Sequence, residues 1–144
     1  MSSPTPEISV PGKYSPNIVD QTEVVTFSSA QLLALHTTPI TLVAAPGTGK
    51  TIIVDEVIWK TTYATSAYTG SNAIEIRYTD GSGSKVSADV PAAVLNISSG
   101  TQSYISRGAS VAYTTNAAVV AVVPAADPAA GAGTATATVK YRIV

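Results

Sequence analysis

The sequence TATATVKYRI at residues 134–143 has the period of a β-strand more clearly than any other part of the chain. Residues that can enter a core alternate along it with polar residues. The first set is Ala135, Ala137, Val139, Tyr141 and Ile143, and the second is Thr134, Thr136, Thr138, Lys140 and Arg142. This alternation predicts a strand with one buried face and one exposed face.

Shorter runs rich in β-branched and aromatic residues lie upstream, separated by residues that favour turns. We expect strands at residues 23–27, 40–45, 50–63, 74–78, 86–90, 104–106, 110–113 and 117–123. The turn-forming residues at 80–83 join the two runs on either side of them as a hairpin. The run at 117–123 is apolar on both faces, which predicts a central strand.

Two short helical segments interrupt the strands. Ser28 and Gln31 have the spacing of a capping box, so a short helix is expected there, ended by Pro39. A helical turn is expected at 91–95 and a loop of small residues at 124–133. About eight or nine strands in all predict an all-β fold, an antiparallel β-sandwich of jelly-roll type with one or two short helices and an extended N-terminal arm.

The first 22 residues differ from the rest because prolines fix the backbone and remove hydrogen-bond donors. We therefore divide the chain into an extended arm, 1–22, and a β-sandwich domain, 23–144. The arm is a candidate for wrapping a neighbouring subunit, and an ordinary frayed terminus is the alternative. The candidate partner-binding residues in it are Pro4, Pro6, Pro11, Tyr14 and Pro16.

The composition excludes several classes of function. Charged residues make up 12% of the 144 residues and the formal net charge is −1, so no basic patch is available for nucleic acid. No cysteine is present, which removes thiolate metal sites and cysteine nucleophiles. We expect no signal peptide and no membrane span, since no apolar run has the required length. A surface with so few charges resists self-association poorly, which favours a protein whose purpose is association.

The sequence AAPGTGKT at residues 44–51 matches a Walker A nucleotide-binding pattern if alanine is allowed at the first glycine. A phosphate-binding loop must lead into a helix, whereas the residues after Lys50 are mostly β-branched and favour a strand. We therefore interpret Gly47, Gly49, Lys50 and Thr51 as a tight turn between strands, and expect no cofactor.

Other polar residues give weaker indications of a site. His36 is the only histidine, which excludes a multi-histidine metal site, and its place after the short helix suits a helix C-terminal contact. Asp55 and Glu56 are adjacent, so on a regular strand they point to opposite faces and cannot act as a catalytic pair. Asp80 and Asp89 could meet across the hairpin and bind a cation, although a solvated pair is the simpler reading.

The aromatic set is unusual, with seven tyrosines against one phenylalanine and one tryptophan. Tyrosine rings can stack on sugars, or they can lie at strand edges and subunit interfaces. The residues in question are Tyr63, Tyr68, Tyr78, Tyr104, Tyr113 and Tyr141.

One part of the chain resembles a known family. Residues 31–59, which include ALHTTPITLVAAPG at 34–47, and then AYTG at 67–70 and IRY at 76–78 resemble small structural proteins of tailed bacteriophages. Such proteins are capsid decoration (cement) or head-fibre components. The resemblance implies a β-sandwich subunit, commonly assembled as a trimer on the shell, and it implies no catalytic residues.

These observations lead to one main hypothesis. We expect a virion protein that is made in the bacterial host cytoplasm, binds the major capsid protein on the outside of the capsid and stabilises the shell without catalysis. Residues 1–21 and the sheet edges would make these contacts. The alternatives are a receptor- or glycan-binding module of a phage fibre that uses exposed tyrosines, and a nucleotide-binding enzyme that uses Lys50.

Overall fold

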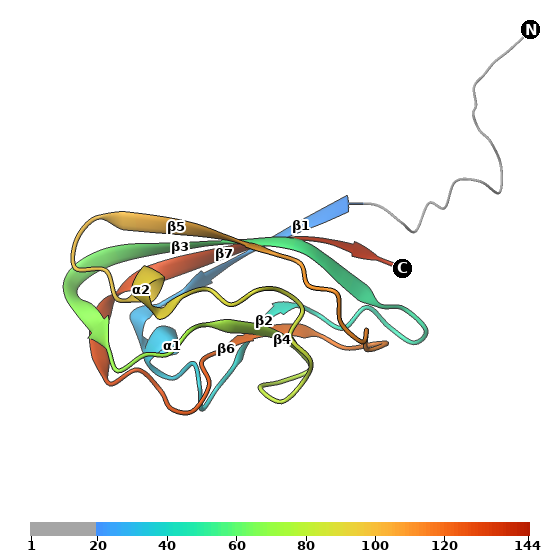
Figure 1. The fold of residues 1–144 in the computed structure, drawn as a ribbon, viewed down its shortest axis with the longest axis horizontal. Coiled ribbons are helices and arrows are strands. Elements are labelled where there is room, and N and C mark those ends of the chain that lie inside the picture. Colours follow the sequence, from blue (N-terminus) through green and yellow to red (C-terminus); the bar gives the residue numbers. More distant parts are fainter. Residues whose placement is uncertain (1–19) are drawn as a thin grey trace, which may run out of the picture.

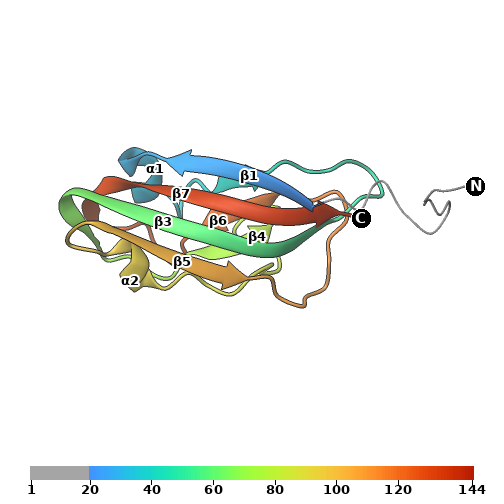
Figure 2. The ribbon, with the colours of Figure 1, turned by 90° about the horizontal axis from the view of Figure 1, so that it is seen from above.

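The computed structural model describes residues 20–144 and shows two antiparallel sheets packed face to face, with two short helices (Figures 1 and 2). The elements in chain order are β1 (Asp20–Phe27), α1 (Ser29–Leu33), β2 (Ile40–Val43), β3 (Ile52–Thr69), β4 (Glu75–Tyr78), α2 (Ala92–Leu95), β5 (Thr101–Arg107), β6 (Val119–Val122) and β7 (Ala130–Ile143). The prediction of an all-β antiparallel sandwich with short helices is confirmed.

Successive strands alternate between the two sheets. The four-stranded sheet has the order β1-β7-β3-β5 and the three-stranded sheet has the order β2-β6-β4, so each connection crosses from one sheet to the other. Figure 2 shows the four-stranded sheet from above, with its strands side by side in this order. The two longest strands, β3 and β7, pair at its centre. Within each sheet, the paired strands are therefore not consecutive in the sequence.

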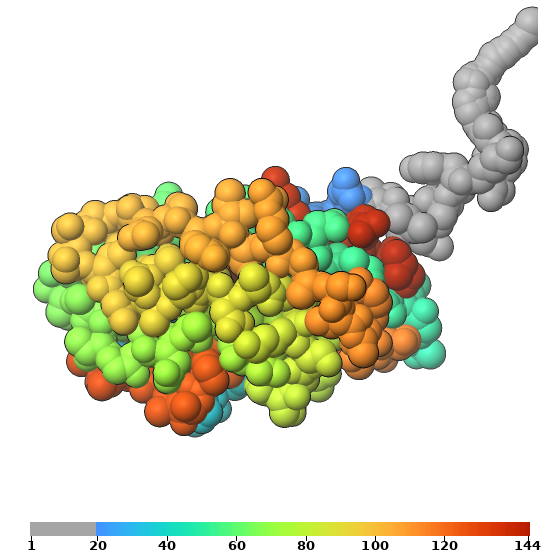
Figure 3. All heavy atoms as spheres, in the orientation of Figure 1, coloured from blue at the N-terminus to red at the C-terminus, as the bar shows by residue number. Residues whose placement is uncertain are grey.

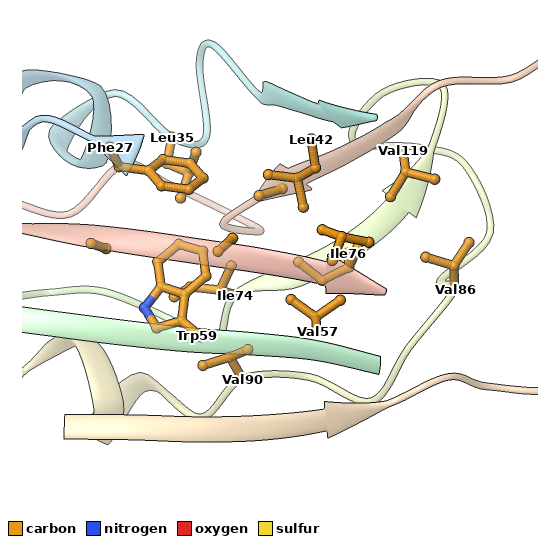
Figure 4. Packing of buried hydrophobic residues seen from close by; sticks show 14 of the residues in the cluster. Phe27, Leu35, Leu42, Val57, Trp59, Ile74, Ile76, Val86, Val90 and Val119 are labelled. Atoms are coloured by element: carbon orange, nitrogen blue, oxygen red, sulfur yellow. The ribbon is translucent and has the colours of Figure 1, made fainter. Parts of the chain in front are cut away.

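The core lies between the sheets, and two of its three largest fully buried side chains come from the strands on either side of β7 (Figure 4). Phe27 on β1 and Trp59 on β3 are fully buried, with ring centroids 4.9 Å apart. Between them, β7 presents only methyl groups to the core, because Ala135 lies opposite Phe27 and Ala137 lies opposite Trp59. The Trp59 indole donates to the hydroxyl of Thr61 at 2.9 Å, so its one polar group is satisfied.

The segment after β4 differs from the predicted hairpin. Residues 86–90 do not form a strand, although Val86 N donates to Ile76 O on β4 at 2.8 Å. The reason is that the segment divides its backbone bonds between the sheets, since Ala88 N donates to Arg107 O on β5 at 3.0 Å. It closes this side of the sandwich, where Figure 3 shows the chain between β4 and β5 as a continuous covering. If this segment is counted as a fourth strand beside β4, each sheet has four strands, as in a jelly roll. The jelly-roll type of the sandwich stays a prediction.

Other boundaries also differ from the predictions. Residues 110–113 form no strand, and β7 begins at Ala130, inside the predicted loop, so residues 20–144 contain seven strands. The helix α1 ends at Leu33, well before Pro39, although its capping box between Ser28 and Gln31 is confirmed. The strand β1 begins at Asp20, so residues 20–22 belong to the sandwich and not to the arm. None of the helices in residues 20–144 is long and apolar enough to cross a membrane.

The outer face of the three-stranded sheet carries a carboxylate that is almost fully buried. Glu75 is only 8% exposed, although it lies on this face. Its carboxylate contacts Arg77 at 2.6 Å and Lys85 at 3.2 Å. Burial raises the pKa of the Glu75 carboxyl, but the hydrogen bonds and charges of Arg77 and Lys85 outweigh burial and hold the pKa below its ordinary value.

We expect Trp59→Ala to lower the free energy of unfolding by about 3–5 kcal/mol, because no neighbouring side chain can fill the space above the alanines of β7. Urea denaturation followed by circular dichroism measures this change. The exposed Lys60→Ala on the same strand serves as the control and should change the stability little. An effect of Trp59→Ala as small as that of the control would contradict the packing described.

The lowered pKa of Glu75 predicts a loss of stability in acid. A group whose pKa is lower in the folded state stabilises the fold fully above its unfolded-state pKa, about 4.3, and loses this contribution as the pH falls through the folded-state value. Unfolding midpoints measured from pH 7 to pH 2 should therefore fall more steeply for the natural chain than for Glu75→Gln. Parallel curves for the two proteins would contradict the ion pairs as a source of stability.

Candidate functional site

The outer face of the four-stranded sheet, formed by β1, β7, β3 and β5, is a broad exposed surface. We call it the outer sheet face. Its middle row runs across all four strands, because Val24 is opposite Thr138, which is opposite Ile58, which is opposite Ile105. Val24 and Ile105, at the two ends of this row, are 61% and 50% exposed. Large apolar side chains thus lie on the two edge strands, at the same level of the sheet.

A groove of about 280 Å³ lies beside this row, toward the start of β1. Two ion pairs converge on Glu56 within it, from Arg107 and from Lys140 at 3.7 Å. Arg142 pairs with Asp55 at 3.1 Å. The lining residues are Asp20, Gln21, Thr22, Asp55, Glu56, Arg107, Lys140 and Tyr141. The groove presents both signs of charge, mostly paired with each other, and suits a polar protein surface better than a single ion.

The prediction that Asp55 and Glu56 point to opposite faces is wrong. The pairing of β3 with β7 shifts register between Val54 and Glu56, which marks a β-bulge at Asp55. The extra residue changes the alternation, so both carboxylates line the groove. Each is paired with basic side chains from other strands, and this arrangement favours a fixed charged surface.

The Walker A-like segment lies in a loop whose backbone amides bond within the protein. Lys50 N donates to Gly47 O at 3.1 Å, Gly47 N donates to the side chain of Asn116 at 2.9 Å, and Thr51 N donates to Val144 O at 2.8 Å. Gly47 and Gly49 have positive φ angles of 110° and 78°, as tight turns often require. The strand β3 begins at Ile52, where a phosphate-binding loop would have a helix.

His36 takes part in a structural contact between loops. Its Nδ1 lies 2.8 Å from Val123 O, whereas its place after the helix suggests a contact with the C-terminal end of α1. The carboxylate of Asp127 accepts hydrogen bonds from the backbone amides of His36 at 2.7 Å and Thr37 at 2.9 Å. The bond from the Thr37 hydroxyl, with these amides, lowers the pKa of Asp127. The bonds of Asp127 join the loop after α1 to the loop before β7. They go to the backbone amides and to the Thr37 hydroxyl, and not to the imidazole of His36.

Asp80 and Asp89 make separate contacts in the structure. Asp80 accepts bonds from the amide and the hydroxyl of Ser82 at 2.8 and 2.7 Å, which closes its own turn and lowers its pKa. Asp89 pairs with Lys85 at 3.0 Å. In the part of the chain that the structure describes, no three acidic, histidine or cysteine side chains gather as a metal site would require.

The tyrosines do not form one platform. Tyr68, Tyr78 and Tyr141 are buried, and their hydroxyls donate to Gly133 O, Ile52 O and the side chain of Gln21. Burial, with a smaller effect of Tyr113, raises the pKa of Tyr78 to about 12. These three rings are not available to stack on a sugar. The glycan-binding alternative therefore loses half of its six candidate tyrosines.

The predicted partner-binding residues Pro4, Pro6, Pro11, Tyr14 and Pro16 lie outside the described residues, so their role stays a prediction. The described chain starts at Asp20, which is opposite Arg142 and lines the groove. The N-terminal segment therefore joins the sandwich next to the groove. Sequence reasoning missed this groove because its residues come from four strands, and only the register of the sheet brings them together.

The fold is similar to that of a chain described as "Cyanophage Pam1 capsid asymmetric unit". The two chains have 18% sequence identity and a TM-score of 0.53, and the match covers 99% of this chain and 96% of the other. The chain shares the fold of a phage capsid component. A scan against protein-family models finds no match, and a comparison with curated proteins finds none either.

We expect the natural chain to show no binding of ATP in isothermal titration calorimetry at nucleotide concentrations up to about 1 mM. Three of the amides that would hold phosphate, those of Lys50, Gly47 and Thr51, already bond to Gly47, Asn116 and Val144. Lys50→Ala should behave in the same way as the natural chain. Binding by the natural chain that Lys50→Ala abolishes would contradict the interpretation of this segment as a turn.

Proposed function

We propose that this chain is a structural protein of a bacteriophage particle that binds the outside of the capsid and stabilises it, as a decoration or cement protein. The observation that carries the proposal is the fold shared with a chain of the cyanophage Pam1 capsid unit, because it extends over nearly the whole length of both chains. The partner would be the major capsid protein, and the site of action the capsid surface of the virion.

The surface chemistry supports a role in contact. Several of the few charged side chains pair with each other in the groove and around Glu75. The rest of the outer sheet face presents mainly threonine and aliphatic side chains. Such a face loses little hydration energy when a protein surface covers it. Many repeated contacts of this kind would stabilise a shell, because anything that binds only the assembled form favours it.

We assign the shell contact to the N-terminal segment and to the groove beside it. Asp20 joins the segment to β1 at the groove, so both would face the same neighbouring subunit. Arg107 in the groove has a side chain that is 73% exposed, which leaves donors of its guanidinium free for a partner. Assembly as a homotrimer on the shell, which the bacteriophage resemblance implies, is a further part of this proposal.

The proposal is tested by counting copies of the chain on particles purified from a host that produces tagged variants, with quantitative mass spectrometry. The full chain should be present in a fixed ratio to the major capsid protein. Removal of residues 1–19 should lower its occupancy at least about tenfold, since a large part of the contact would be lost. Thermal unfolding should show that the shortened chain still folds, because β1 begins at Asp20.

Two substitutions on the outer sheet face provide a matched pair. Arg107→Glu lies in the groove, whereas Lys60→Glu lies on the same face beyond the middle row. The first should lower occupancy and the second should not. Absence of the full chain from particles would overturn the proposed function, and equal effects of the two substitutions would overturn the assignment of the contact to the groove.

A further inference from the structure

We propose that β1 is a self-association edge, at which two copies of the chain join their four-stranded sheets by antiparallel pairing of β1 with β1 of the second copy, centred on Val24. This contact would join two free chains in solution and does not depend on the homotrimer proposed for the shell. It is defined by one strand, one register and a two-fold axis.

On one side of the sandwich, the segment 84–90 bonds to β4 and to the end of β5 at Arg107. The segment 84–90 donates from Val86 N to Ile76 O on β4 at 2.8 Å and from Ala88 N to Arg107 O on β5 at 3.0 Å. On the other side, β1 has β7 as its only partner among residues 20–144. The strand β2 also lies on that side but has only four residues. Among the edge strands of the described fold, β1 is the longest, with eight residues, and no described segment bonds to its outer edge.

This edge has little of the usual protection against pairing. Natural edge strands carry proline, lysine and other charges, or a bulge, to prevent another strand from adding to them, and the charges of β1 are Asp20 and Glu23. The strand β1, DQTEVVTF, contains no proline or lysine, and it pairs with β7 without a register shift. At its centre, Val24 is 61% exposed. An open edge of this kind requires an extended strand as its partner, because only a strand matches its row of donors and acceptors.

The orientation of the unpaired backbone groups follows from the sheet. Thr51 and Val144 exchange both of their backbone bonds, at 2.8 and 2.9 Å. Along an antiparallel pair, residues that exchange backbone hydrogen bonds alternate with residues that do not. Since Val144 bonds to β3, the backbone groups of the even-numbered residues of β7 point toward β3, and those of the odd-numbered residues point toward β1. The odd-numbered residues of β1 bond to β7 in turn. Thr22, Val24 and Thr26 therefore direct their N–H and C=O groups to the open edge.

The sequence of β1 is self-complementary about Val24. In an antiparallel pair with its two-fold axis at this residue, Val24 lies opposite Val24 of the second copy, and Thr22 lies opposite Thr26. These are the residues with outward backbone groups, so each such pair can exchange two hydrogen bonds. Valine and threonine pairs of this kind stabilise sheets. The pattern Thr-x-Val-x-Thr thus suits a second copy of the same chain as the occupant.

Charge and area set the strength of this contact. No like charges lie directly opposite, because Glu23 lies opposite Val25, and Asp20 lies opposite Ser28. The two Glu23 side chains lie diagonally on one face, about 7–8 Å apart by their Cα atoms, and repel each other weakly. A single strand edge buries less surface than the roughly 1,200 Å² of a stable complex. The dimer should therefore form in a concentration-dependent way.

Sedimentation velocity on the full chain, from about 10 μM to about 1 mM, tests the proposal. The natural chain should pass from monomer to dimer over this range. Val24→Lys should weaken the dimer by more than about tenfold, since two ammonium groups would lie opposite each other. Ile105→Lys is the matched control, because Ile105 lies in the same row and is similarly exposed but lies on the other edge strand. It should leave the dimer unchanged.

Glu23→Gln provides a test in the opposite direction, because it removes the diagonal repulsion and should strengthen the dimer a few-fold. Unfolding midpoints of all variants show whether each one is folded. A chain that stays monomeric throughout the range would overturn the proposal. A dimer that Val24→Lys does not weaken would also overturn it. The same holds for a dimer that Ile105→Lys weakens as much as Val24→Lys does.

Discussion

The packing of Phe27 against Trp59 across β7 is the constraint on which the rest of the sandwich depends. Two large rings can meet in the core only because the strand between them presents Ala135 and Ala137 there. Larger residues at these positions would push the rings apart, and interiors packed to native density tolerate such excess volume poorly. The small inner residues of β7 thus fix where β1 and β3 lie, and with them the register that forms the outer sheet face.

The alternation of strands between sheets explains why the two sides of the sandwich differ. Each connection crosses from one sheet to the other, so no hairpin closes either sheet. On one side, the segment 84–90 bonds to β4 and to β5 and serves both sheets. On the other side, β1 and β2 have no such shared segment in the described chain. Within the described chain, the backbone groups of β1 that point away from β7 therefore have no strand partner, and they are suited to contacts between chains.

The sequence predicts those parts of the fold that depend on local pattern. The alternation at 134–143 and the capping box of Ser28 and Gln31 are strong because the residues that define them are neighbours. The bulge at Asp55 escaped prediction because a two-residue period is assumed along any strand, and nothing local marks its interruption. Residues 86–90 alternate like a strand, yet their hydrogen bonds are shared with β5, a partner that no local pattern reveals.

The same distinction applies to the candidate site. Low charge content indicated a protein of contacts, but it gave no location, because the groove forms only when four strands bring Asp20, Glu56, Arg107 and Lys140 together. There the charges neutralise each other, and the middle row beside them is uncharged. A partner that covers this face would therefore desolvate few free charges, whereas a face with unpaired charges would oppose its own burial. The scarcity of charge is thus a physical condition for the proposed contacts, as well as a sign of them.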